Sequence, residues 1–286
     1  MDNKNKGTLF SIISAILLSL SYIFFTILLK DNSISQILFY WFLIALAFSL
    51  AFGITKRKIA IKEIKNNLSP LIILGLIEGL AAILFLVSLK LIGPVLTSFF
   101  TQFVFIFVLI YSILFLKENF KPIEFIGIIL AIIGVLVINW NQDISIIKGS
   151  LLAIVTALLF ATSSFIAKKY IKKISPNTIN STRLFFITIF GLGYLFIQNE
   201  NFIISQNSIW LIITGALFCA FLGFELFYNS LKYIKLGASN TIRALSPVFT
   251  LLFAFLILSE IPSLIKNIGS FLILIGVLLL IKWQKR

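Results

Sequence analysis

Long apolar stretches separated by short polar segments dominate the pattern along this chain. Ten of these stretches are about 18 to 25 residues long, and a helix of about 20 apolar residues crosses a hydrocarbon core of roughly 30 Å. They cover residues 7–29, 34–55, 68–89, 93–116, 122–139, 148–170, 176–197, 207–231, 236–259 and 264–281. Because the segments between them are short, consecutive helices should be antiparallel neighbours. The pattern predicts an all-α membrane protein with ten transmembrane helices.

Composition agrees with this class and excludes an ordinary soluble fold. Hydrophobic residues make up 60% of the chain, charged residues 12%, and the mean hydropathy is +1.10. Histidine, the commonest metal ligand and neutral-pH proton shuttle, is absent. The single cysteine, Cys219, cannot form an internal disulfide. We therefore expect no metal and no cofactor.

The net charge of +14 raises nucleic acid as a partner, but the distribution of the basic residues explains it differently. If the N-terminus is cytoplasmic, inside segments hold eighteen Lys and Arg and outside loops hold four, Lys30, Lys90, Lys148 and Lys266. Such a bias follows the positive-inside rule. It predicts a multi-pass protein of the cell (plasma) membrane with both termini cytoplasmic and no nucleic-acid partner. The first span is long and lacks a clear small-residue cleavage site, so we expect it to be retained rather than cleaved as a signal peptide.

The chain repeats itself without a gap at a spacing of 142 residues, which is the distance from Ser88 to Ser230. The matching segments are Ser88-Leu89-Lys90 with Ser230-Leu231-Lys232, Leu116 and Glu118 with Leu258 and Glu260, and Gly127 and Gly134 with Gly269 and Gly276. Residues 1–142 and 143–286 are therefore predicted to be two versions of one five-helix unit.

The two units carry opposite charge biases. Lys168, Lys169, Lys172 and Lys173 follow the first span of the second unit, whereas the first unit has only Lys30 at that place. Conversely, the basic loop 56–65 corresponds to a stretch around 199–201 that has no basic residue. Five spans per unit also require opposite orientations. The sequence thus predicts inverted repeats, which in secondary transporters hold the substrate site between the halves near mid-bilayer; a purely structural duplication is the alternative.

These motifs resemble the EamA-type permeases of the drug/metabolite transporter superfamily over essentially the whole chain. Each half closes on Leu-x-Glu and a Gly-x₆-Gly-Val helix, and Arg183-Leu184-Phe185, Ser230-Leu231-Lys232-Tyr233 and Pro247-Val248-Phe249 look like that family's second half. Two residues depart from the pattern. Phe105 stands where the family's first half has proline, and Trp41 occupies the position that matches Arg183 of the second half. The resemblance implies a permease of small metabolites, amino acids among them.

Small residues at helical spacing predict close packing between helices. Ser11, Ala15 and Ser19 form one such face and Ala153, Ala157 and Ala161 the equivalent one, so spans 1 and 6 are expected to pack together at the seam between the halves. Gly75 with Gly79, Gly127 with Gly134, and Gly269 with Gly276 are further packing faces.

Four ionisable residues lie within predicted spans, namely Glu78, Arg183, Glu225 and Arg243. Charges inside a membrane are costly when they face lipid, so each should face the bundle interior or water. Arg243 and Glu225 lie at equal depth in neighbouring spans, which predicts an ion pair between them or a substrate contact of Arg243. Glu78 has no cation in its own span and is a candidate proton or cation site. Arg183 either reaches headgroups by snorkelling or contributes to the substrate site.

Pro247 marks a polar niche in the ninth span. Lacking an N–H, it leaves the carbonyl of Arg243 without its helical partner, close to Ser246. The matching turn of the first half offers the uncharged Thr101 and Gln102, so the niche should be asymmetric. Further residues expected to line the cavity are Tyr22, Trp41, Tyr228 and Asn229.

The charge inventory and the resemblance together predict an exporter of amino acids that works by alternating access. Arg243, with Arg183, would attract a carboxylate, and Glu78 or Glu225 would bind a proton or an amine. The alternatives are a proton-coupled cation or drug exporter built on Glu78, and a non-transport membrane scaffold. An embedded enzyme is disfavoured because no nucleophile–base spacing appears. We expect a small-molecule substrate, a lipid bilayer and a monomer or weak homodimer.

Overall fold

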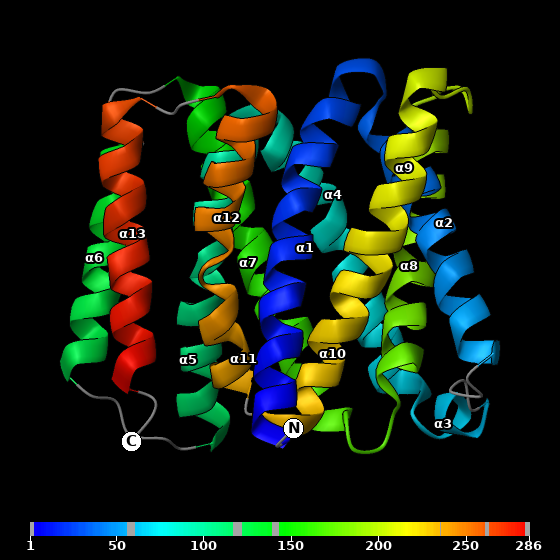
Figure 1. The fold of residues 1–286 in the computed structure, drawn as a ribbon, viewed down its shortest axis with the longest axis horizontal. Helices are drawn as coiled ribbons and strands as arrows, with labels where there is room; N and C mark the ends of the chain where they lie inside the picture. Colours follow the sequence, from blue (N-terminus) through cyan, green and yellow to red (C-terminus); the bar gives the residue numbers. More distant parts are fainter. Residues whose placement is uncertain are drawn as a thin grey trace.

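A computed structural model describes residues 3–55, 61–116, 122–138, 143–234, 236–260 and 263–283, and every element of these ranges is helical. In chain order the elements are α1 (Asn3–Asp31), α2 (Ile34–Thr55), α3 (Ile61–Asn66), α4 (Leu68–Phe100), η1 (Thr101–Phe103), α5 (Val104–Leu116), α6 (Pro122–Ile138), α7 (Ile144–Tyr170), α8 (Pro176–Ile197), η2 (Gln206–Ser208), α9 (Ile209–Gly215), η3 (Ala216–Gly223), α10 (Phe224–Tyr233), α11 (Leu236–Arg243), α12 (Ser246–Phe253), η4 (Ala254–Leu258) and α13 (Leu264–Trp283). The helices stand side by side as one bundle (Figure 1).

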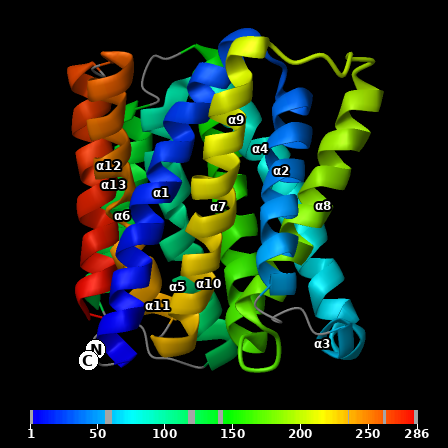
Figure 2. The same cartoon turned by 45° about the vertical axis from the view of Figure 1, so that its right-hand side comes forward.

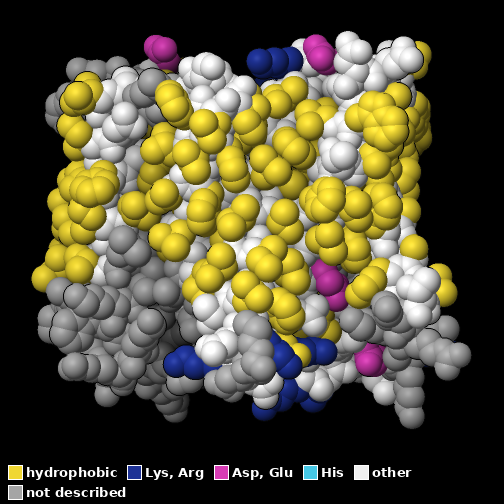
Figure 3. Space-filling model, in the orientation of Figure 1, with side chains coloured by type: hydrophobic (Ala, Val, Ile, Leu, Met, Phe, Trp, Pro, Cys, Tyr) yellow, Lys and Arg dark blue, Asp and Glu magenta, His cyan; other side chains and the backbone are white. Residues whose placement is uncertain are grey.

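The bundle has the dimensions and the surface of a membrane protein. Six helical stretches of the described chain are long and apolar enough to cross a membrane, at 3–31, 34–55, 68–108, 144–170, 176–197 and 206–233. Shorter apolar helices run over 126–138, 246–258 and 267–276. Figure 3 shows hydrophobic side chains over the middle of one face and most of the visible charged side chains near its two ends. The protein is therefore an all-helical, multi-pass membrane protein.

The 41-residue stretch 68–108 bends sharply at Gly93. Gly93 has φ 77° and ψ 174°, a conformation that a residue with a Cβ rarely adopts. Pro94 follows and disfavours helical geometry at the residue before it. The break coincides with the sequence-predicted boundary between the spans at 68–89 and 93–116.

A second break divides the stretch around Pro247. α11 ends at Arg243, residues 244 and 245 form a turn, and α12 begins at Ser246 with the proline in its first turn. Proline is tolerated there because the first N–H groups of a helix have no intrahelical partner. The predicted ninth span is thus a discontinuous helix.

The glycines of α6 and α13 bring these two helices into backbone contact. A Cβ on Gly134 would lie 2.6 Å from the carbonyl oxygen of Gly269, and one on Gly276 would lie 2.4 Å from that of Gly127. No side chain fits in these gaps, so the seven-residue glycine spacing serves packing, as predicted. Gly75 and Gly79 of α4 likewise let the rings of Phe186 and Phe190 on α8 pack directly against the backbone of α4.

The expectation that the small faces of spans 1 and 6 pack on each other is wrong. α1 contacts α10, α11 and α12, α7 contacts α4, and α1 and α7 make at most a marginal contact. Ser11 Oγ is 2.9 Å from Ser239 Oγ, and Ser14 Oγ donates to the carbonyl of Gly223 at 2.7 Å. On α7, the carbonyl of Gly149 accepts from Ser88 Oγ at 2.9 Å. Each small face thus packs against the other half, but against a different helix than the one expected.

Contacts at one end of the bundle fix the directions of α1 and α7. A Cβ on Gly7, near the start of α1, would lie 2.8 Å from the side chain of Ile234. Lys168 Nζ, near the end of α7, donates to the carbonyls of Leu231 and Ile234 at 2.6 and 2.8 Å. α1 therefore starts where α7 ends, and these helices, which occupy equivalent places in the sequence repeat, run in opposite directions. The start of α1 and the end of α13 lie at the same end of the bundle (Figures 1 and 2).

Candidate functional site

Two adjoining cavities lie at the centre of the bundle. One, of about 80 Å³, is lined mainly by the rings of Phe25, Trp41, Phe42, Phe85, Phe160 and Phe224, and we name it the aromatic cavity. The other, of about 70 Å³, includes the polar side chains of Tyr22, Thr101, Gln102, Ser164, Asn240, Arg243 and Ser246, and we name it the polar cavity. Leu18, Tyr22, Glu78, Phe160, Phe224 and Arg243 line both.

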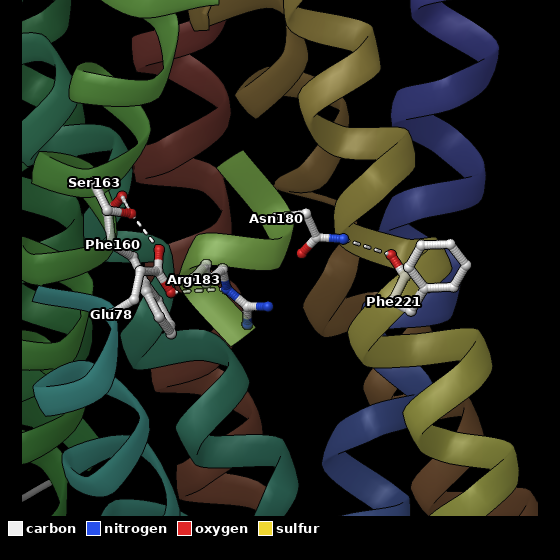
Figure 4. Close-up of polar contacts among 6 residues, drawn as sticks. All are labelled: Glu78, Phe160, Ser163, Asn180, Arg183 and Phe221. Atoms are coloured by element: carbon white, nitrogen blue, oxygen red, sulfur yellow. Dashed lines mark hydrogen bonds and ion pairs between the residues drawn. The ribbon is translucent and has the colours of Figure 1, made fainter. Parts of the chain in front are cut away.

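A buried ion pair forms part of the wall of the aromatic cavity. Arg183 Nε on α8 lies 3.0 Å from Glu78 Oε2 on α4, and the two side chains are only 4% and 2% exposed. Ser163 Oγ on α7 donates a hydrogen bond to the other carboxylate oxygen, Oε1. Figure 4 shows the carboxylate of Glu78 held between the two donors. Glu78 is therefore not the lone carboxylate that the sequence predicted, because its cation comes from the other half of the chain.

Arg183 is stacked between aromatic rings rather than reaching headgroups. Its guanidinium carbon lies 3.4 Å from the ring centroid of Phe224 and 5.7 Å from that of Phe42, which favours the cation. Of its buried donors, Nη1 has no hydrogen-bond partner in the part of the chain that the structure describes. The snorkelling alternative is wrong for this residue, and an unfilled donor remains at the aromatic cavity.

Arg243 does not form the expected ion pair with Glu225. Its guanidinium carbon lies 4.1 Å from the ring centroid of Phe227. It makes no hydrogen bond to the described residues, and it lines both cavities. One turn earlier in α11, Asn240 lines the polar cavity, is 1% exposed, and has no partner for Nδ2 within the described ranges.

Three predicted lining residues of α10 lie behind the cavity wall. Glu225, Tyr228 and Asn229 do not appear among the described residues that line either cavity. Glu225 Oε1 accepts a hydrogen bond from Asn229 Nδ2 at 3.0 Å, and Tyr228 is packed against Phe227 with ring centroids 5.2 Å apart. These three residues support Phe224, whose side chain lines both cavities.

The other predicted residues lie at the cavities. Trp41 lines the aromatic cavity and stacks on Phe25 at a centroid distance of 4.4 Å. Gln102 and Ser246 line the polar cavity, where Ser246 Oγ is 2.7 Å from Ser19 Oγ. The hydroxyl of Tyr22 is 2.9 Å from Thr101 Oγ1. Both broken helices, α4–η1–α5 and α11–α12, thus contribute to the polar cavity.

A π-helical segment, η3, forms part of the wall of the aromatic cavity. η3 has π-helical geometry, and two of its residues, Cys219 and Ala220, line the aromatic cavity. Asn180 Nδ2 on α8 donates to the carbonyl of Phe221 at 3.1 Å, as Figure 4 shows. Such wide turns are frequent at functional sites. No sequence signal that we used predicts this segment.

Sequence reasoning missed Asn240 and Ser163. Asn240 lies three residues before Arg243, on the same helical face, so the spacing alone could have identified it. Ser163 occurs in an otherwise apolar span, where its contact with Glu78 depends on the packing of α7 against α4. The described residues contain no group of three His, Cys, Asp or Glu side chains that could hold a metal ion.

Several pairs of positions 142 residues apart in the sequence line the same cavity. The pairs Leu18 and Phe160, Trp41 and Arg183, Glu78 and Ala220, and Ala82 and Phe224 all line the aromatic cavity. The pairs Tyr22 and Ser164, Thr101 and Arg243, and Val104 and Ser246 all line the polar cavity. Both cavities therefore lie where the two sequence halves meet. The charged lining residues are distributed unequally between the two halves.

An all-helical membrane bundle with an internal, partly charged cavity is the architecture of a permease. The family model of the EamA-like transporter family matches residues 5–140 and again residues 147–282. The chain belongs to the EamA-like transporter family.

Individual relatives agree with this assignment. An uncharacterised transporter of Clostridium kluyveri is 26% identical over 288 residues, which is 95% of this chain and 91% of the relative. One from Archaeoglobus fulgidus is 28% identical over 177 residues, 62% of this chain and 64% of the relative, so that match spans less than two thirds of its length. A solved crystal structure has a TM-score of 0.72 at 15% identity over 96% of both chains, which supports the fold alone.

Proposed function

We propose that the protein is a secondary transporter that moves small organic metabolites by alternating access through the two central cavities. Family membership supports the transporter class, and the opposite directions of α1 and α7 support two inverted five-helix units, residues 1–142 and 143–286, with ten spans in total. The position of the cavities between these units supports the site. In such a carrier, solute binding and release require no chemical step on the solute.

We further propose the plasma membrane as its location, with both chain ends in the cytoplasm. The lysine and arginine bias of the loops supports this orientation. Lys168 illustrates it, because its ammonium group caps the carbonyls at the end of α10 on the face where α1 starts.

The cargo that we propose carries a carboxylate, and amino acids are the first class to test. The observation that carries this proposal is the presence of two guanidinium groups, Arg183 and Arg243, at cavities otherwise lined mainly by apolar and uncharged polar groups. A guanidinium group binds carboxylates with paired, charge-assisted hydrogen bonds. Inside a membrane protein, such groups are typical of substrate pathways.

Counterflow in proteoliposomes tests the proposal. Vesicles loaded with unlabelled amino acid should accumulate the radiolabelled form when they contain the wild-type protein. We expect Arg243→Ala to lower the rate at least tenfold, and Gly193→Ala, at a position with no neighbouring atom within 4 Å of an added Cβ, to leave it unchanged. Equal rates with Arg243→Ala and wild type for every amino acid would contradict the binding role of Arg243.

A further inference from the structure

The unfilled polar groups at the two cavities are hydrogen-bond donors. Arg183 Nη1 and Asn240 Nδ2 are buried without a partner in the described chain, and Arg243 contacts the ring of Phe227 rather than a carboxylate. A buried donor without an acceptor is unfavourable, so a ligand that supplies acceptor oxygens relieves this cost. The site is therefore complementary to an acceptor-rich, negatively charged group.

The one carboxylate among the described lining residues is already engaged. Glu78 accepts from Arg183 on one oxygen and from Ser163 on the other. A ligand ammonium at this carboxylate would share it with Arg183 and lie close to that guanidinium. Two like charges close together in a low-dielectric interior repel each other strongly. The described lining residues therefore include two cations and one carboxylate that is already paired, and they offer no second carboxylate to an ammonium group.

The aromatic cavity favours the apolar part, or body, of a ligand. Seven aromatic side chains line the aromatic cavity, and Arg243 lies where that cavity meets the polar one. Aromatic and aliphatic groups gain most of their binding free energy from burial against such surfaces. A ligand can therefore place its hydrocarbon part among the rings while its head group contacts Arg243 and Asn240.

We propose that the site recognises an organic monoanion with an apolar, preferably aromatic, body, and that it makes no use of an ammonium group. The carboxylate binds Arg243 and Asn240 in the polar cavity, and the body fills the aromatic cavity. This inference rests on the proposed transport function and narrows it, because a free α-amino group then weakens binding instead of strengthening it.

Three ligands with the same aromatic body separate the possibilities. They are 3-phenylpropanoate, phenylalanine and phenethylamine, which are an anion, a zwitterion and a cation at neutral pH. Binding to the purified full chain is measured by isothermal titration calorimetry, and transport by counterflow. We expect 3-phenylpropanoate to bind at least tenfold more tightly than phenylalanine, and phenethylamine to show no saturable binding.

Three variants locate the contact. Arg243→Gln should weaken 3-phenylpropanoate at least tenfold, and Asn240→Asp, which places a negative charge beside the head group, should weaken it further while phenethylamine gains affinity. Asn240→Ala, which removes the amide without adding a charge, should have a smaller effect than Asn240→Asp. Monodisperse elution and an unchanged unfolding temperature confirm that each variant folds.

Tighter binding of phenylalanine than of 3-phenylpropanoate would overturn the inference while leaving the transport function intact, since the protein would then recognise the amine. Equal affinity of all three ligands, or unchanged anion affinity in both Arg243→Gln and Asn240→Asp, would also overturn it. If counterflow is absent for every solute of any charge, the proposed function fails together with the inference that rests on it.

Discussion

Arg183 Nε lies 3.0 Å from Glu78 Oε2 and joins α8 to α4, so that the two halves of the sequence meet in a buried ion pair. Each group is almost fully withdrawn from solvent, and Ser163 on a third helix, α7, holds the second carboxylate oxygen. In a low-dielectric interior each charge depends on its partner. The pair therefore links three helices around the cavities.

Removing one member of this pair should destabilise the protein strongly. Arg183→Met leaves Glu78 as a buried charge that only Ser163 contacts, and loss of one partner in such a pair costs about 3–5 kcal/mol. Glu78→Leu should destabilise the protein by a similar amount, because it leaves the guanidinium of Arg183 buried without its carboxylate partner. The free energy of unfolding in detergent, measured by chemical denaturation, checks both variants.

The double variant Glu78→Leu/Arg183→Met is the decisive control. Buried pairs are often replaced by apolar residues at little net cost, so the double variant should be more stable than either single one. Additive losses in the double variant would show that the two side chains contribute to stability independently.

The glycine contact between α6 and α13 should not accept a methyl group. In Gly134→Ala the added Cβ would lie 2.6 Å from the carbonyl oxygen of Gly269, which belongs to the backbone and cannot rotate away. Overpacking of this kind costs about 1–3 kcal/mol. Gly193→Ala on α8 meets no atom within 4 Å and should be neutral or stabilising by up to about 1 kcal/mol. The apparent unfolding temperature distinguishes the two; equal temperatures would contradict the close packing.

Gly215→Ala should damage the site rather than the fold. An added Cβ would lie 1.9 Å from Cη2 of Trp41, whose ring lines the aromatic cavity and is 1% exposed. The ring must move toward the cavity space, so we expect an apparent affinity in counterflow about tenfold weaker, equivalent to about 1.4 kcal/mol. Gly193→Ala is the matched control. Unchanged affinity would show that the position of Trp41 is not limiting.

Cys219 offers a direct measurement of access to the cavity. It is the single cysteine of the chain, lines the aromatic cavity and is 0% exposed. A maleimide should label it slowly, and a bound cargo should slow labelling further because the ligand occupies the same space. Mass spectrometry of the intact protein gives the rate, and Cys219→Ser provides the blank. Labelling that cargo does not slow would contradict binding in the aromatic cavity.

Gln36→Ala should accelerate the labelling of Cys219. Gln36 Nε2 donates to the carbonyls of Asn201 and Ile203 at 3.0 and 2.9 Å, which ties the start of α2 to the loop before α9. If the proposed carrier opens to solvent at this end of the bundle, this contact breaks, so its loss should raise the open fraction and the labelling rate. Thr55→Ala, whose hydroxyl bonds only within α2, is the control. Equal rates would show that Gln36 does not restrict access.

The helices and their interruptions were predictable because they depend on local sequence. Runs of apolar residues locate the spans, Pro247 marks the break before α12, and glycine spacing identifies the faces of α6 and α13. Gly93 followed by Pro94 likewise lies at a predicted boundary. These features all involve residues close together in the sequence.

The partners of the charged residues were not predictable, because they depend on which helices become neighbours. Equal depth suggested that Arg243 should meet Glu225, yet the rotation of α11 places the guanidinium over Phe227. Contact between α4 and α8 pairs Glu78 with Arg183, 105 residues away in sequence. The same lack of neighbour information led to the wrong pairing of α1 with α7.

The cavities are built on matched positions of the two halves, yet both guanidinium groups come from the second half and the carboxylate comes from the first. In the alternating-access carrier proposed above, the anionic end of the cargo would therefore bind the same half of the protein whichever side of the bilayer the site faces, and the cargo would not have to turn end over end.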